Sequence, residues 1–147
     1  MQVLESHDGT RYVLLKRSSD SSLVRDPETG ESRYVPNADL TVVEGASPLE
    51  TAAGAVPESA RRVLRATHTD RALGLLLELD ARGPTPVRAL LEYEMCESDL
   101  HGTLAEFRAA GLVAEASIAG ERGYELTDTA REGLAVLRGP SAEASDD

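Results

Sequence analysis

The chain has 147 residues, of which 41% are hydrophobic, and this suits one compact domain or two small ones with a buried core. Aromatic residues make up only 3%, with no tryptophan and one phenylalanine. The core is therefore expected to consist mainly of Leu, Val and Ala, and an aromatic platform that stacks single-stranded bases is excluded. The formal net charge of -11 argues against a polyanionic partner, because like charges repel.

The first 44 residues alternate short strand-like runs with turn residues. The runs are 2–5, 11–16, 22–25, 31–35 and 40–44. The dipeptide Asp8-Gly9 favours a tight hairpin turn between the first two runs, and Pro27 and Gly30 favour a turn between the third and fourth. The pattern predicts a small antiparallel β-meander of four or five strands in a β-rich module spanning residues 1–45. A sheet this small is marginal by itself, so it is expected to pack on the helical part or on a second subunit.

Beyond a short joint at residues 45–48 the apolar spacing changes to the helical period. Helices are predicted at 57–67, 70–79, 86–93 and 97–110, with a last one that follows Thr127. Asp70 is the expected N-cap of the second helix, and Gly111 is the expected stop of the fourth. The side chains expected to point inward are Val56, Ala60, Val63 and Leu64, then Leu73, Leu76 and Leu77, then Val87, Leu90 and Leu91, then Leu100, Leu104 and Phe107, and finally Ala130, Leu134 and Leu137.

A β-hairpin is predicted between the fourth and the last helix. Its strands are expected at 112–118 and 124–126, with a turn at 119–123 that carries Arg122 at its tip. The fold class is therefore α+β. The helical part is expected to span residues 46–138, and residues 139–147 are expected to form a disordered acidic tail.

The string GPTPVRALLEYEMCESDLHGTLAEFRAAGLV at residues 83–113 resembles the core of winged helix-turn-helix regulators of the MarR, ArsR and PadR groups. The similarity continues through the predicted hairpin into YELTDTAREGL, which resembles the usual start of the helix after the wing in those groups. The resemblance covers about sixty-five residues, roughly as many as one small domain needs. It implies a winged helix-turn-helix domain preceded by the β-meander, a homodimer, and double-stranded DNA as the partner.

The resemblance also implies where DNA would be contacted. The helix at 97–110 would enter the major groove, and the hairpin at 112–126 would lie on the DNA backbone. The side chains expected to contact DNA are Ser98, His101 and Thr103 at base edges, and Arg108 and Arg122 at phosphate or base.

Three carboxylates on the same helix, Glu97, Asp99 and Glu106, oppose the approach of phosphate. A second function therefore stays open at this point. The domain would be a protein-interaction adaptor in a transcription or chromosome-associated complex, without direct DNA binding, and the N-terminal β module would offer a docking edge to a protein partner.

The densest basic stretch of the chain contains Arg61, Arg62 and Arg65. These arginines would either flank DNA or form a solvated face with ion pairs to Glu58 and Asp70. Both interpretations remain open from the sequence alone.

Enzymatic and metal-dependent functions are not expected. The sequence has no phosphate-binding glycine loop, no nucleophile elbow and no zinc-protease motif. The single cysteine, Cys96, is expected to be buried or partly buried, and with His7, His68 and His101 scattered along the chain it does not make a tetrahedral metal site. No cofactor is predicted. The chain has no long apolar run, so a cytoplasmic location and no contact with a membrane are expected.

The arrangement of charge suggests a habitat. Lys16 is the only lysine, the other basic residues are arginines, and acidic residues are spread along the chain. This composition resembles haloarchaeal proteins, whose acidic surfaces stay hydrated in concentrated salt, and the whole chain looks like haloarchaeal proteins of this winged-helix class. We therefore expect the acidity to reflect a halophilic archaeal source, with an ordinary acidic mesophile protein as the alternative.

Overall fold

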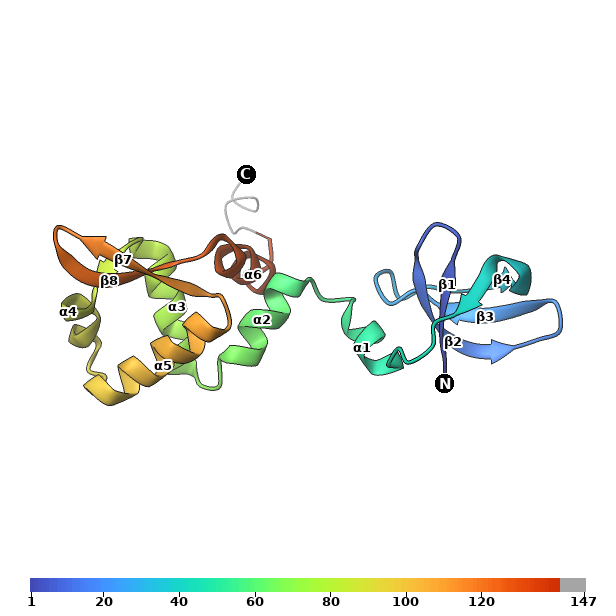
Figure 1. The fold of residues 1–147 in the computed structure, drawn as a ribbon, viewed down its shortest axis with the longest axis horizontal. Coiled ribbons are helices and arrows are strands. Elements are labelled where there is room, and N and C mark those ends of the chain that lie inside the picture. Colours follow the sequence, from blue (N-terminus) through green and yellow to red (C-terminus); the bar gives the residue numbers. More distant parts are fainter. Residues whose placement is uncertain (141–147) are drawn as a thin grey trace. The chain divides into compact units, whose positions relative to one another are not determined.

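The computed structural model describes residues 1–140, and these form an α+β structure, as predicted. The chain divides into two compact units, the first Met1–Val56 and the second beginning at Pro57 (Figure 1). The segment 46–56, expected at the start of the helical domain, is part of the first unit. Most of the predicted acidic tail, residues 141–147, lies outside the described residues.

The first unit contains the predicted antiparallel sheet, and it has five strands. They are β1 (Val3–Ser6), β2 (Arg11–Arg17), β3 (Ser21–Arg25), β4 (Ser32–Pro36) and β5 (Leu40–Val42). Their order in the sheet is β4-β3-β2-β1-β5, so only the first four follow one another as a meander. A 3-10 helix, η1 (Asn37–Asp39), precedes β5, which pairs with the free edge of β1 instead of with β4.

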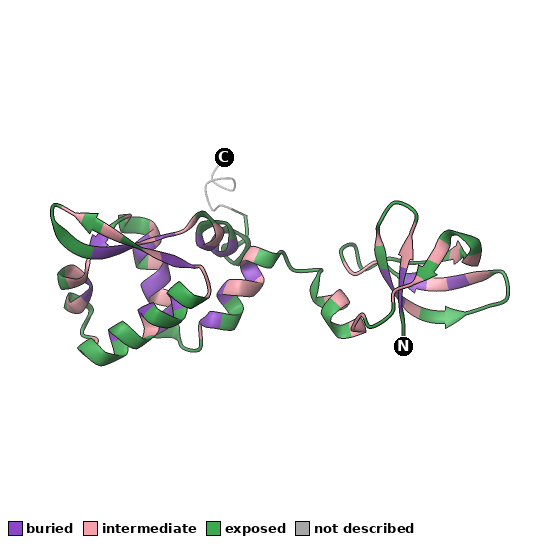
Figure 2. Ribbon diagram, in the orientation of Figure 1, coloured by how far each residue is buried: buried purple, intermediate pink, exposed green. Residues whose placement is uncertain are grey.

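The two faces of this sheet carry different apolar residues because successive side chains of a strand point to opposite faces. One face buries Leu4, Tyr12 and Val24 in a single cluster. Figure 2 shows the buried segments of the ribbon in purple. The neighbouring residues Val3 and Val13 are buried on the other face.

A short helix that the sequence analysis did not predict, α1 (Pro48–Ala53), contacts β2. The Ser47 hydroxyl accepts a hydrogen bond from the Glu50 backbone N–H and so caps its first turn. A Ser with Glu three residues later and Pro at the first helical position is a known signature of a helix start, so the signal was present in the sequence.

The second unit is helical with a small sheet. Its elements are α2 (Glu58–Ala66), α3 (Asp70–Arg82), β6 (Thr85–Pro86), α4 (Val87–Leu90), η2 (Leu91–Tyr93), α5 (Glu97–Ala109), β7 (Val113–Ile118), β8 (Glu121–Leu126) and α6 (Asp128–Arg138). The three strands are arranged in the order β6-β8-β7. The predicted helices and hairpin are confirmed, whereas the two-residue strand β6 was not predicted.

One apolar cluster joins every helix of the second unit to the hairpin. The predicted inward residues of α5, Leu100, Leu104 and Phe107, are all fully buried in it together with Leu76 and Leu90. Leu77 and Leu91, expected to be equally buried, are only partly buried at its edge.

Three other inward assignments were wrong. Leu64 on α2 is 54% exposed, Leu137 on α6 is 42% exposed, and Val56 is 37% exposed. Leu64 and Leu137 are on helices α2 and α6, whereas Val56 precedes α2 and is not helical, so the helical period does not apply to it. Packing decided the exposure of the two leucines.

Local geometry corrects two further assignments. Thr69, not Asp70, is the N-cap of α3, and its hydroxyl accepts a hydrogen bond from the Ala72 backbone N–H. The turn of the β7–β8 hairpin is only two residues long, Ala119 and Gly120, both with positive φ, which is the usual geometry of a tight hairpin. Arg122 therefore lies within strand β8 and not at the tip.

Close packing of α2 on α6 depends on a glycine. A Cβ added to Gly133 of α6 would lie 2.4 Å from the Ser59 carbonyl oxygen of α2, which no side chain tolerates. Gly123 of β8 has the same role beside β6, where a Cβ would lie 2.3 Å from the Thr85 carbonyl oxygen. At both positions the absence of a side chain allows the backbones of two neighbouring elements to approach closely.

Candidate functional site

The exposed side of α5 is a narrow stripe of small and polar residues. An α-helix turns once every 3.6 residues, so residues three, four and seven apart share a face. Ser98, His101 and Arg108 follow this spacing and are exposed, with Ala105 and Ala109 between them on the same face. The opposite face supplies the buried Leu and Phe residues of the core.

The structure separates Thr103 from the other sequence-predicted residues of this helix. Thr103 is half-buried beside the core face, whereas Ser98 and His101 are exposed on the stripe. The same helical phase turns the carboxylates Asp99 and Glu106 away from the middle of the stripe. Asp99 and Glu106 therefore border the stripe, whereas Glu97, four residues before His101, lies on the same side as that residue and 3.6 Å from its Nε2 atom.

A groove of about 590 Å³ runs between α5 and the hairpin. His101, Ala105 and Arg108 line it from α5, and Arg122 and Tyr124 line it from β8. Three of the sequence-predicted DNA contacts, His101, Arg108 and Arg122, are thus brought together at one groove.

A carboxylate that the sequence analysis did not single out connects two of these cations. The Glu115 Oε1 atom of β7 accepts a hydrogen bond from Arg108 Nη1 at 2.9 Å and from Arg122 Nη2 at 3.0 Å. Glu115 is directly opposite Tyr124 in the strand register, so the two side chains share the face that packs on α5. No sequence signal marked Glu115, because its partners come from another helix and from the next strand.

Tyr124 contacts the Arg122 guanidinium through both its hydroxyl and its ring. The Arg122 Nη2 donates to the Tyr124 hydroxyl at 3.1 Å, and the guanidinium carbon lies 5.9 Å from the ring centre. The hydrogen bond to Tyr124, followed by its charge interactions with Tyr124 and Glu115, raises the pKa of Arg122 above its ordinary value. Arg122 is therefore a permanently charged and well-positioned cation at this groove.

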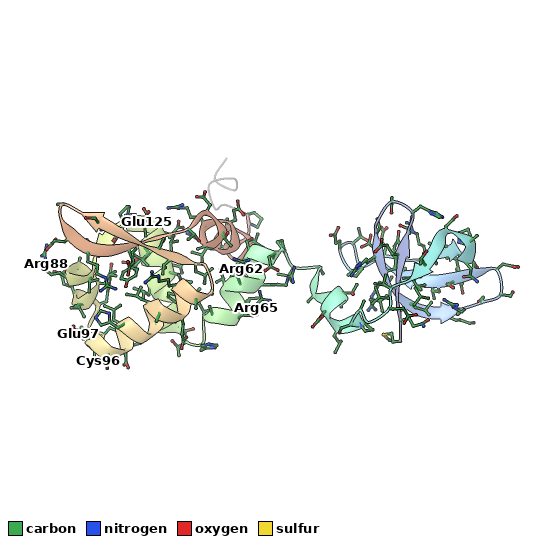
Figure 3. The ribbon with its side chains drawn as sticks, viewed as in Figure 1. Arg62, Arg65, Arg88, Cys96, Glu97 and Glu125 are labelled. Atoms are coloured by element: carbon green, nitrogen blue, oxygen red, sulfur yellow. The ribbon has the colours of Figure 1, made fainter. Side chains whose placement is uncertain are left out.

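A second ion pair fixes the other side of the hairpin. Arg88 on α4 donates from Nε and from Nη2 to the two carboxylate oxygens of Glu121, each at 3.2 Å. This contact lowers the pKa of Glu121 and raises that of Arg88. Figure 3 shows Arg88 on α4, beside the hairpin. Salt contacts thus link the hairpin to both α4 and α5.

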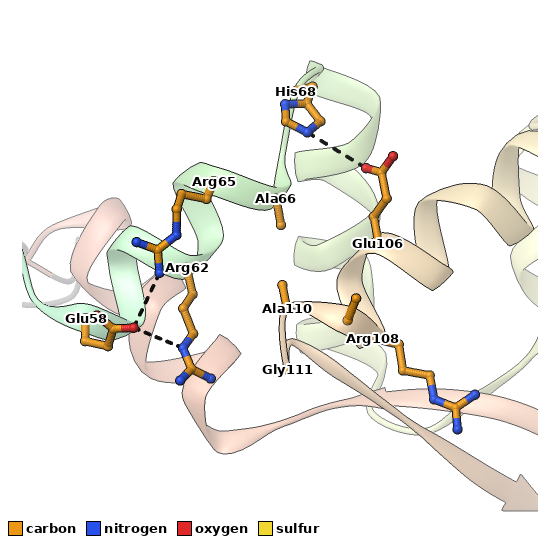
Figure 4. A pocket seen from close by; sticks show the side chains of 10 residues that line it. Glu58, Arg62, Arg65, Ala66, His68, Glu106, Arg108, Ala110 and Gly111 are labelled. Atoms are coloured by element: carbon orange, nitrogen blue, oxygen red, sulfur yellow. Dashed lines mark hydrogen bonds and ion pairs between the residues drawn. The ribbon is translucent and has the colours of Figure 1, made fainter.

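A second groove, of about 660 Å³, lies between α2 and the C-terminal end of α5 (Figure 4). Arg62 and Arg65 line it, and both guanidiniums bind Glu58 Oε1, at 3.2 and 3.4 Å. Arg61 also pairs with Glu58, through Oε2 at 3.2 Å. Of the alternatives left open by the sequence, ion pairing of this basic stretch with Glu58 is confirmed. Helix α2 carries three arginines and only one carboxylate, so its own residues have an excess of positive charge.

The histidines and the cysteine form no common centre. Cys96, expected to be buried or partly buried, is exposed at the start of α5, next to Glu97 in Figure 3. His101 is 3.6 Å from Glu97, and His68 is 3.9 Å from Glu106. Within residues 1–140 no group of three or more His, Cys, Asp or Glu residues is placed to hold a metal ion. Over the same residues no helix has the length and apolarity needed to cross a membrane.

Residues 1–138 match a protein family described as a family of unknown function (DUF7346). The chain belongs to this family. The match spans both units, so the family is defined by the sheet and the helical unit together. Neither the curated proteins nor the solved structures contain a significant match.

Proposed function

We propose that this protein is a DNA-binding transcription regulator and that its second unit is a winged helix-turn-helix domain. The element order supports this: α3, the short strand β6, then α4, the 3-10 helix η2 and α5, then the β7–β8 hairpin. In a winged helix the short strand between the first two helices pairs with the hairpin, and β6 pairs with β8 in this way. Helix α5 is then the recognition helix, and the hairpin is the wing.

The observation that carries the proposal is the exposed stripe of α5 beside the groove with two guanidiniums. The stripe is narrow and carries small side chains, which allows a helix to enter a major groove. Ser98 and His101 would face base edges, while Arg108 and Arg122, which converge on one carboxylate oxygen in the free protein, would bind DNA backbone phosphate. The excess positive charge on α2 would attract DNA phosphate at a second region of the surface.

A homodimer fits the same proposal. The helices α2 and α6, which pack on each other, expose Leu64, Val136 and Leu137 at 54%, 45% and 42%. A second copy that covers these side chains would place two α5 helices on successive half-sites of a DNA duplex. Light scattering on the samples used for binding measures whether the protein is a dimer.

The test is selection of preferred duplexes from a random DNA pool with the full chain, followed by fluorescence anisotropy on the selected and a random duplex in molar KCl. We expect a measurable preference for the selected duplex. Arg122→Ala should weaken binding to both duplexes and reduce the slope of log affinity against log salt by about 0.9, because one phosphate contact is lost.

His101→Ala should narrow the gap between selected and random duplex by about fivefold, which is the lower range for loss of a base contact. Thr103→Ala is the matched control, because Thr103 is on the same helix but half-buried and off the stripe. It should leave the preference unchanged. Absence of any enriched duplex would contradict DNA binding.

The alternative function, a protein-interaction adaptor, is favoured by one observation in the first unit. Strands β4 and β5 are the two ends of the sheet order, and β4 exposes Tyr34 at 58%. Such an edge is suited to pairing with a strand of a protein partner. Failure of the DNA selection would leave this edge as the leading candidate surface.

A further inference from the structure

The contact between Glu115, Arg108 and Arg122 has an unusual form. Both guanidiniums converge on the same carboxylate oxygen, Oε1 of Glu115, at 2.9 and 3.0 Å. All three side chains are well exposed, at 42%, 58% and 64% for Glu115, Arg108 and Arg122. An anion is thus held between two arginines in an open groove, at the position where the proposed DNA contacts meet.

A phosphate group satisfies the same donors. Guanidiniums bind carboxylate and phosphate oxygens with similar geometry and charge. Exposed ion pairs contribute at most about 1 kcal/mol each, so water and another anion can replace the carboxylate at little cost. Glu115 is on strand β7, whose Val113 packs in the core, and its own side chain is 42% exposed to solvent.

Arg122 does not depend on Glu115 alone for its position. Its guanidinium also donates a hydrogen bond to the hydroxyl of Tyr124, a residue that is 4% exposed. Departure of the carboxylate therefore leaves Arg122 held at the groove, and Arg108, on the last turn of α5, lines the same groove.

From this arrangement we infer that the Glu115 carboxylate occupies the place of a DNA backbone phosphate in the free protein, and that a phosphate displaces it on binding. This inference rests on the proposed function. Glu115 is then a residue that limits affinity for every DNA sequence equally, because phosphates are common to all of them. The selectivity carried by the stripe of α5 would be unaffected.

The experiment compares the full-length wild type and Glu115→Gln by fluorescence anisotropy against the selected duplex and a random duplex. The glutamine variant should bind both duplexes about fivefold more tightly, since the competing charge is removed while the size of the side chain is kept. The ratio of the two affinities should not change. The gain should disappear when Arg108→Ala and Arg122→Ala are added.

Glu125→Gln is the matched control. Glu125 is adjacent to Tyr124 in β8, so its side chain points to the opposite face of the hairpin, and its substitution changes the net charge by the same amount. It should leave both affinities within experimental error of wild type. Glu115→Ala serves as a second variant and should show the same gain, with circular dichroism to verify folding.

The possible results separate the two proposals. If wild type prefers its selected duplex and neither Glu115 variant binds more tightly, the inference is wrong and the proposed function stands. If Glu125→Gln gives the same gain, the effect is one of net charge and the inference is also wrong. If neither wild type nor Glu115→Gln binds any duplex, both the inference and the proposed function are overturned.

Discussion

The two units of this protein are stabilised in different ways. The first unit buries a small cluster of Leu4, Tyr12 and Val24, supported by polar contacts such as the hydrogen bond of 2.7 Å from Arg33 to the Tyr12 hydroxyl. The second unit buries one continuous cluster that reaches from α2 through the hairpin to α6. The cluster of the second unit contains 16 buried residues, whereas that of the first unit contains three.

The largest expected effect tests the core of the second unit. Phe107→Ala should reduce the free energy of unfolding by about 3 to 5 kcal/mol, because Phe107 is fully buried and its removal leaves a cavity. Urea denaturation measures the loss. Arg71→Ala, at an exposed position of α3, is the control and should change the free energy of unfolding by only about 0.5 kcal/mol. Equal losses for the two variants would contradict the assigned core.

A smaller effect tests the backbone packing of α2 on α6. Gly133→Ala should destabilise the second unit by about 1 to 3 kcal/mol, since its Cβ would overlap the Ser59 carbonyl and force the helices apart.

Gly102→Ala provides the opposite case on α5, because a Cβ there meets nothing within 4 Å. It should stabilise the helix by about 0.5 to 1 kcal/mol. The thermal unfolding midpoint should therefore fall for Gly133→Ala and rise for Gly102→Ala, relative to wild type. A lower midpoint for both variants would contradict the open space at Gly102.

The smallest effect concerns the turns of the first unit. The Ser6 hydroxyl and then the Thr10 backbone N–H donate hydrogen bonds to Asp8, which lowers the pKa of its carboxyl from 3.8 to about 2. A carboxyl with a lowered pKa stabilises the folded state above pH 4, and this contribution is lost as the pH falls from 3.8 toward 2.

Titration of the Asp8 carboxyl carbon by NMR should give a midpoint near the lowered pKa of about 2. Asp8→Asn should lower the thermal midpoint of the first unit at pH 5, and the difference from wild type should vanish near pH 2. A difference that persists unchanged at low pH would show that the charge of Asp8 is not responsible.

Much of the second unit was predictable because its signals are local. The spacing of Leu100, Leu104 and Phe107 predicted the buried face of α5, and this was confirmed. The same spacing failed at Leu64 and Leu137, because periodicity says which residues share a face but not how far the neighbouring element extends over it. The helix α1 was missed although Ser47 and Glu50 gave a start signal, since it is shorter than the window in which periodicity is visible.

In the candidate site, too, the sequence placed some residues correctly and others wrongly. The sequence placed His101 and Arg108 on the exposed side of α5, a consequence of helical phase alone. It placed Arg122 at a hairpin tip, but the two-residue turn at Ala119 and Gly120 moves Arg122 into strand β8, where Tyr124 orients it. The prediction that these residues contact DNA stays a prediction.

By itself, the sequence determined the α+β class, the antiparallel strands of the first unit, expected as four or five, and the succession of helices and hairpin in the second, because turn residues and apolar period act within short stretches. Only the tertiary structure decided that β5 pairs with β1, that β6 joins the hairpin, and that Glu115 bridges Arg108 and Arg122. These contacts join residues from different elements, and the energy that selects them comes from packing of the whole unit, which no local pattern encodes.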